Sequence, residues 1–229
     1  MLIVAIPKSA STSLLKTFGV LHGIESVQDF SIKDYKAPEG ASILNSIHSD
    51  LREITGELAD RFSDEETLYK QHIFPSENNL SLLKNVKKVV LLRDPEEIVL
   101  AYYRGAHKKV HTLLEGYSLS FTQEEWIEKS RQDGLMNELH FFHDRWLKEE
   151  DQNTLIIWYK DLLNKPKEVV NSMESLFGLK PTDGDVVLAR ERYSRRKGLE
   201  YISYLIGVYS KKGVKKLLRI FRRVKKIEY

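Results

Sequence analysis

The chain has 229 residues, which is long enough for one well-buried core or for one core with an appended segment. It is 41% hydrophobic and 30% charged, as is usual for a water-soluble globular protein, and its net charge of only +3 argues against a nucleic-acid partner for the molecule as a whole. No cysteine is present, which excludes disulfides, thiolate metal sites and a cysteine nucleophile.

The sequence shows no segment typical of targeting or of membrane insertion. The apolar run at the N-terminus is short and has no basic region before it, unlike a signal peptide. No stretch approaches the roughly 20 apolar residues that a membrane-spanning helix needs. We therefore expect a cytoplasmic protein, in which any contact with a membrane would be peripheral.

The N-terminal segment combines an apolar run with a hydroxyl-rich turn. Residues 2–6 are typical of a buried strand, and residues 12–21 have the apolar spacing of a helix. The residues from this turn into the helix start are Lys8, Ser9, Ala10, Ser11, Thr12 and Ser13. A strand that turns into a helix N-terminus directs backbone N–H groups and the positive end of the helix dipole at one spot, which suits a phosphate or sulfate. An ordinary capped helix is the alternative, because Ser and Thr are preferred N-caps.

Strands and helices alternate along the chain as far as Gly178, which closes the last helix of this series. The further expected strands are residues 66–74, 88–92 and 154–159. The expected helices are residues 50–62, 80–84, 96–109, 122–150 and 165–177, with loops at 28–40 and 75–79. This alternation predicts an α/β fold, with a central parallel sheet flanked by helices on both faces.

Four polar residues lie at or near the carboxyl ends of the predicted strands: Lys8, His72, Arg93 and Tyr159. Ligands of parallel sheets bind at these strand ends, so we expect the four side chains to meet around one ligand. Three of them have a structural alternative. Arg93 could pair with a nearby carboxylate, His72 could be a surface histidine, and Tyr159 could be a core aromatic.

Motifs at these positions resemble those of the sulfotransferases that use 3′-phosphoadenosine 5′-phosphosulfate (PAPS). Residues 7–12 resemble the family's 5′-phosphosulfate loop, and residues 89–95, followed by Tyr102-Tyr103-Arg104, resemble its 3′-phosphate segment. Residues 70–75 are similar to the lysine-x-histidine segment, and residues 158–162 to the tyrosine strand and its following helix. The triplet Arg196-Lys197-Gly198 resembles the basic-glycine segment near the end of the family pattern.

The resemblance implies a P-loop NTPase-like sulfotransferase fold over residues 1–200 and sulfuryl transfer to an acceptor hydroxyl without a metal. Lys8 would hold the leaving-group oxygens, Lys70 would steady the sulfuryl group, and His72 would act as general base. The implied cofactor contacts are Lys8, Ser9, Ala10, Ser11, Thr12, Ser13, Arg93, Tyr159, Arg196, Lys197 and Gly198. The implied acceptor is a hydroxyl-bearing small molecule, a sugar or a lipid, and His48 is a rival base.

The chain departs from the family pattern at three positions. Ala10 replaces a usual glycine, Ala101 replaces a usual serine of the 3′-phosphate site, and Ser13 replaces a large residue. These changes leave open a non-catalytic relative that binds a nucleotide or a membrane. A P-loop kinase is a further alternative, although the loop contains no glycine and its lysine stands at the start instead of the end.

Two regions carry less specific expectations. Residues 28–50 and 105–150 should line the acceptor site, with Tyr117, Phe121 and Trp126 among them. Residues 201–229 form a basic amphipathic segment, which predicts a helical C-terminal extension. Its apolar face would pack on the domain or lie on an anionic membrane surface.

Overall fold

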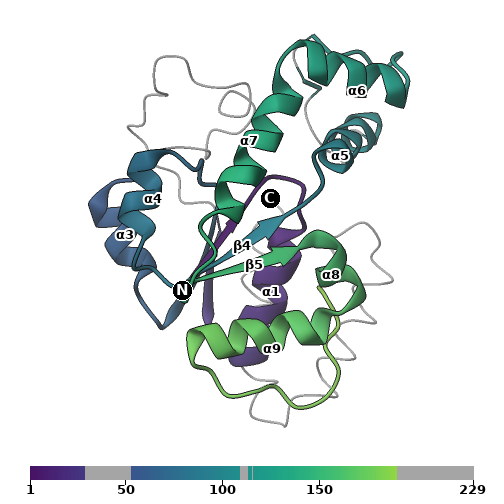
Figure 1. The fold of residues 1–229 in the computed structure, drawn as a ribbon. Helices are drawn as coiled ribbons and strands as arrows, with labels where there is room; N and C mark the ends of the chain where they lie inside the picture. The colour runs from purple at the N-terminus through teal and green to yellow at the C-terminus, as the bar shows by residue number, and fades with distance from the viewer. Residues whose placement is uncertain (29–52, 109–112, 115, 190–229) are drawn as a thin grey trace, which may run out of the picture. The chain divides into compact units, whose positions relative to one another are not determined.

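The computed structural model describes residues 1–28, 53–108, 113–114 and 116–189 (Figure 1). Its five described strands form one parallel sheet in the order β2-β3-β1-β4-β5. The strands are β1 (Leu2–Ala5), β2 (Glu25–Gln28), β3 (Thr67–Gln71), β4 (Lys88–Leu92) and β5 (Thr154–Trp158). The helices are α1 (Ser11–His22), α3 (Gly56–Phe62), α4 (Glu77–Leu83), α5 (Pro95–His107), α6 (Gln123–Gln132), α7 (Leu135–Leu147), α8 (Tyr159–Asn164) and α9 (Pro166–Phe177). The predicted α/β fold with a flanked parallel sheet is confirmed.

Alternate residues of β1 face two separate hydrophobic clusters. Leu2 and Val4 belong to the cluster that includes side chains of α3, α4 and α7, whereas Ile3 and Ala5 belong to the cluster with α1 and α9. All four residues are fully buried, as expected for the central strand of a sheet covered on both faces. The continuous apolar runs of β1 and β4 follow directly from this two-sided burial.

Several predicted helix boundaries were wrong because polar side chains cap the helices at other positions. The helix predicted from residue 50 begins only at Gly56, where Thr55 accepts a hydrogen bond from the Leu58 amide. The loop predicted at 75–79 is shorter, because Ser76 caps α4 by accepting a hydrogen bond from the Asn79 amide. Both caps satisfy amides that the first helical turn leaves without an intrahelical partner.

The single helix predicted over residues 122–150 is two helices, α6 and α7. Gly134 lies between them with a φ of 85°, in the left-handed region that a glycine enters without steric cost. The change of direction lets α5, α6 and α7 pack on one another.

Two elements were not predicted. The strand β2 lies at the edge of the sheet, and its residues Glu25 and Ser26 are exposed, so it lacks an apolar pattern. A side chain at Gly19 of α1 would meet Ser26 Oγ at 2.1 Å, which shows how closely α1 approaches β2. The short helix α8 begins at Tyr159, which was expected to end a strand.

The chain divides into two units, Met1–Leu188 and Ala189–Tyr229. The predicted basic helix at 201–229 and the domain boundary at residue 200 lie outside the described residues and stay predictions. Within the described part of the chain, no helix has the length and apolar character to span a bilayer.

Candidate active site

Parallel register brings the predicted site residues to one edge of the sheet. Val4 pairs with Gln71 of β3 and with Val90 of β4, and Val90 pairs with Ile156 of β5. Beyond this row, the chain reaches Lys8 after β1, His72 after β3, Arg93 after β4 and Tyr159 after β5, each within four residues. We call this edge the carboxyl edge, and it lies where an α/β sheet binds its ligands.

The loop at residues 6–10 joins β1 to α1 and has a strained backbone. Lys8 and Ala10 have φ values of 68° and 65°, in the left-handed region that costs a residue with a side chain roughly 1–2 kcal/mol. Ser9 between them is fully buried, and its hydroxyl donates to the Ile6 carbonyl over 2.6 Å. Left-handed residues in such a loop turn backbone N–H groups toward a common concavity that suits an anion.

The N-terminus of α1 lacks the negative charge that the other helices carry there. Every other helix of the described residues has an acidic side chain in its first turn, whereas α1 has none. Its N-cap residue Ala10 has no side-chain acceptor for the amides of the first turn. Because Lys8 precedes this turn, the local potential is positive, and a bound phosphate could complete the helix end.

Arg93 connects the strand end of β4 to three other parts of the chain. Its Nη1 donates to the Lys8 carbonyl oxygen over 2.6 Å, and its Nε donates to Glu97 Oε2 over 3.1 Å. Its guanidinium carbon lies 4.0 Å from the centre of the Tyr159 ring. Only 9% of Arg93 is exposed. Arg93 therefore does pair with a nearby carboxylate, while it also lies between two other predicted site residues.

His72 is buried and directed toward β1. Its Nδ1 lies 2.7 Å from the Ala5 carbonyl oxygen, and the residue is 7% exposed, so it is not a surface histidine. A carbonyl oxygen can only accept, so Nδ1 carries a proton in this contact. In the neutral ring the lone pair is then on Nε2, which is the atom that could take a proton from a substrate.

Lys70 is buried within the sheet, and the ring of Tyr102 contacts Lys8. Lys70 lies within β3, opposite Ile3, and is only 3% exposed. The Lys8 Nζ lies 5.2 Å from the centre of the Tyr102 ring, close enough for a cation–π contact. Tyr102 and Glu97 were not predicted as site residues. The signal available in the sequence was their spacing, because Glu97 and Tyr102 of α5 follow Arg93 by four and nine residues.

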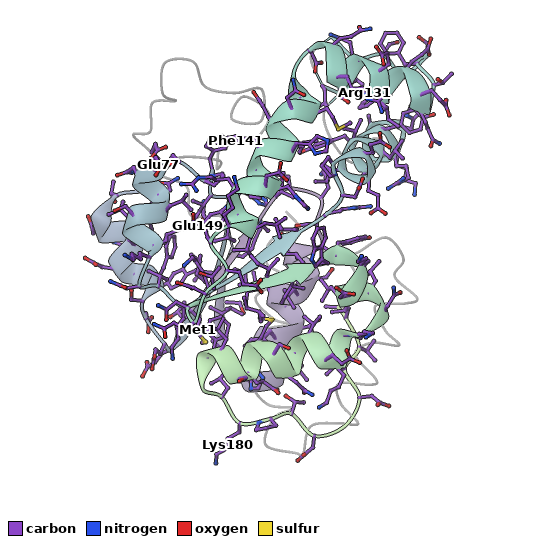
Figure 2. All side chains as sticks on the ribbon, in the orientation of Figure 1. Met1, Glu77, Arg131, Phe141, Glu149 and Lys180 are labelled. Atoms are coloured by element: carbon purple, nitrogen blue, oxygen red, sulfur yellow. The ribbon has the colours of Figure 1, made fainter. Side chains whose placement is uncertain are left out.

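The aromatic residues expected around the acceptor have different surroundings. The rings of Tyr117 and Trp126 pack 4.6 Å apart, and both residues belong to the hydrophobic core cluster that includes side chains of α5 and α7. Two residues beyond His72, the ring of Phe74 stacks on that of Phe141 at 5.5 Å. Phe141 projects from α7 and is half exposed (Figure 2).

A cavity of about 310 Å³ lies at the opposite edge of the sheet. Lys88 and Thr154, which begin β4 and β5, line it together with residues of α4 and α7, including Glu77 of α4 (Figure 2). This cavity is therefore separate from the candidate site at the carboxyl edge. The described ranges contain no group of three or more His, Asp or Glu side chains placed to hold a metal ion.

Other predicted site residues lie outside the described residues. These are Arg196, Lys197 and Gly198 of the cofactor set, together with the rival base His48 and most of the first acceptor segment. The described site residues come from the loop at 6–10, the start of α1, β3, and the ends of β4 and β5.

Comparison with known proteins agrees with this arrangement. A model of the sulfotransferase domain family matches residues 1–198, so the chain belongs to that family. None of the curated protein sequences is similar enough to match it. The predicted family and transferase class are thus confirmed.

Solved structures share the fold at low sequence identity. A sulfotransferase from Alicyclobacillus acidocaldarius superposes with a TM-score of 0.56 and 12% identity over 95% of this chain and 94% of the other. The mouse sulfotransferase SULT7A1, complexed with PAP, superposes with a TM-score of 0.55 and 11% identity over 100% of this chain and 84% of the other. At these identities the likeness shows the fold.

Proposed function

We propose that this protein transfers a sulfuryl group from PAPS to the hydroxyl of a small-molecule acceptor at the carboxyl edge of the sheet. Membership of the sulfotransferase family supports the reaction class. The single observation that carries the site is the grouping of three side chains at the start of α1: Arg93 bonds to the strained loop that holds Lys8, and His72 bonds to Ala5 directly before that loop.

The residues at this edge fit the charges of the donor. The acid-free N-terminus of α1 and the ammonium of Lys8 suit the 5′-phosphosulfate. Arg93 suits the 3′-phosphate, because a guanidinium presents several N–H donors in a fixed plane. The hydroxyl of Ser9 already donates to Ile6, so backbone amides would take a larger share of the 5′-phosphate than its side chain. Tyr159 would adjoin the adenosine.

The transfer itself needs positioning and charge stabilisation more than covalent work by the protein. When bound, PAPS supplies the sulfuryl group, whose bond to the 5′-phosphate oxygen breaks as its bond to the acceptor oxygen forms. His72 Nε2 takes the acceptor's proton, and its Nδ1 bond to Ala5 holds the ring in the required tautomer. Lys8 stabilises the negative charge that develops on the departing 5′-phosphate.

The acceptor would approach from the side of His72. The stacked rings of Phe74 and Phe141 supply an apolar surface next to the segment that carries the base. An acceptor hydroxyl attached to a carbon-rich body would bury apolar area against this surface. The proposal therefore favours such an alcohol over a fully polar sugar.

Calorimetry of the purified protein with 3′-phosphoadenosine 5′-phosphate (PAP) tests the donor site, with ATP and Mg²⁺ as the control. We expect micromolar binding of PAP and no comparable binding of ATP. Tight binding of ATP with Mg²⁺ and none of PAP would instead support the kinase alternative. Binding of PAP without sulfate transfer to a panel of alcohols would support the non-catalytic alternative.

A further inference from the structure

The contacts of Arg93 reach beyond a single phosphate site. Its side chain bonds to the main chain of the loop at 6–10, although 85 positions separate Arg93 from Lys8 in the sequence. The acceptor of that bond is the carbonyl of a residue in the left-handed conformation. A strained conformation persists only where its surroundings hold it, and Arg93 is part of those surroundings.

The bond to the Lys8 carbonyl also sets the direction of an amide. The C=O and N–H groups of a planar trans peptide point in opposite directions. Arg93 therefore fixes the orientation of the Lys8–Ser9 peptide, and with it the direction of the Ser9 N–H. The Ser9 side chain, which donates to Ile6, holds the other side of the same turn.

Glu97 and Tyr159 in turn hold the guanidinium in place. Glu97, in the first turn of α5, accepts through its Oε2 from Arg93 Nε over 3.1 Å, and the Tyr159 ring lies 4.0 Å from the guanidinium carbon. A carboxylate at Nε and a ring against its face restrict both the plane and the rotation of this group. The nitrogen that meets Lys8 is thereby aimed at the loop.

We propose that Arg93 is a positioning residue for the loop at 6–10 in addition to a ligand of the 3′-phosphate. It holds the loop in its anion-binding shape before the donor arrives, so that affinity for the 5′-phosphate depends on Arg93 as well. This inference rests on the proposed function, because it assigns a second task to a residue of that donor site.

Adenosine 5′-phosphate (AMP) separates the two tasks, because it lacks the 3′-phosphate. If Arg93 contacts only the 3′-phosphate, Arg93→Ala weakens PAP binding and leaves AMP binding unchanged. If Arg93 also positions the loop, Arg93→Ala weakens the binding of AMP by about tenfold, the effect of losing one hydrogen bond to a charged group. Calorimetry with both nucleotides measures this, and its stoichiometry reports the folded fraction of each variant.

Arg93→Lys keeps the experiment decisive if Arg93→Ala fails to fold. Lysine retains the positive charge for the 3′-phosphate, yet its single nitrogen cannot take the places of both Nε, which meets Glu97, and Nη1, which meets Lys8. We expect this variant to lose AMP affinity by a similar factor while it keeps part of the preference for PAP over AMP.

Arg131→Ala is the matched control. Arg131 of α6 pairs with Glu96, the neighbour of Glu97 on α5, at 2.7 Å, and it is exposed (Figure 2). Its removal should leave the affinities for both nucleotides within about twofold.

The outcomes distinguish the inference from the function on which it rests. A loss of AMP affinity in the Arg93 variants, with full stoichiometry, supports the positioning role. Unchanged AMP affinity with weakened PAP affinity overturns the positioning role and leaves the proposed function standing. If the wild-type protein binds neither nucleotide, the proposed function fails and the inference fails with it.

Discussion

Each edge of the sheet buries one cationic side chain, that of Lys88 at the start of β4 or that of Arg93 directly after its end. The two side chains find their hydrogen-bond partners in different ways. We call the opposite edge, where the strands begin, the amino edge. There Lys88 donates to the carbonyls of Leu83 and Val86 over 2.9 and 3.3 Å, within the segment that leads into its own strand. At the carboxyl edge, Arg93 reaches a loop from a distant part of the sequence.

We propose that this difference separates a structural cation from one that serves a ligand site. Burial lowers the pKa of the Lys88 ammonium, because local carbonyls only partly replace its water. Those contacts close a turn and involve no left-handed backbone. Arg93 instead bonds to a strained loop at a helix N-terminus without acidic residues, where a ligand would compensate for the strain.

The largest expected effect is a difference in kcat/KM between variants of Lys8 at the carboxyl edge and of Lys88 at the amino edge. Lys8→Ala should lower kcat/KM for sulfate transfer by about 100-fold or more, because charge on the leaving 5′-phosphate loses its stabilisation. Lys88→Met, which keeps an unbranched apolar side chain, should leave kcat/KM of the folded protein nearly unchanged. Steady-state rates with a fixed acceptor measure both. Similar losses in the two variants would remove the distinction between the edges.

The next effect concerns the proposed base. His72→Asn keeps an N–H group near the position of Nδ1, which can still donate to Ala5, and it removes Nε2. We expect kcat to fall by about 100-fold or more while PAP affinity is kept. Rates and calorimetry on the same preparation measure the two quantities. An unchanged kcat would assign the base to another residue, and His48 would be the first to test.

A smaller effect is expected from the backbone strain at the carboxyl edge. Ala10→Gly should raise the free energy of unfolding by about 0.5–1 kcal/mol, because glycine avoids the left-handed penalty at a φ of 65° and gives back part of this through its entropy. Urea denaturation measures this change. Ala59→Gly within α3 is the control and should lower the same free energy by about 1–2 kcal/mol, because it loses helix propensity and a buried methyl group. If Ala10→Gly destabilises the protein as Ala59→Gly does, Ala10 is not strained.

The smallest effect is a pH dependence remote from the carboxyl edge, at the last residue of α1. Burial lowers the pKa of His22 below its usual 6.5, although Glu174, 3.1 Å away, opposes the shift. The unfolded chain then binds more protons than the folded one, so the stability contributed above pH 6.5 declines as the pH falls through this value. We expect His22→Asn to make the decline shallower, as measured by denaturation between about pH 7 and 5. An equally steep decline in the variant would show that other groups cause it.

The sequence by itself determined the central strands, several helix ends and the order of the motifs. The short apolar runs of β1 and β4 indicated buried strands. Gly178 ends α9 as predicted, and α5 begins at Pro95, one residue before its predicted start. Because the strands are parallel, the residues that follow them had to meet at one edge. These features depend on local periodicity and caps, which a single sequence displays.

Tertiary structure decided the features that rest on backbone pairing and long-range contact. The exposed residues of β2 join the sheet through main-chain hydrogen bonds to β3, which leave no pattern of side chains. Lys70 of β3 is only 3% exposed, a burial that its charge does not predict, and the left-handed Lys8 carries no glycine signal. The bond from Arg93 to the Lys8 carbonyl joins a side chain to a backbone atom whose orientation only the folded loop defines. Residue identity alone does not encode such a direction, because it arises from the packing of β1, β4 and α5 around the same edge.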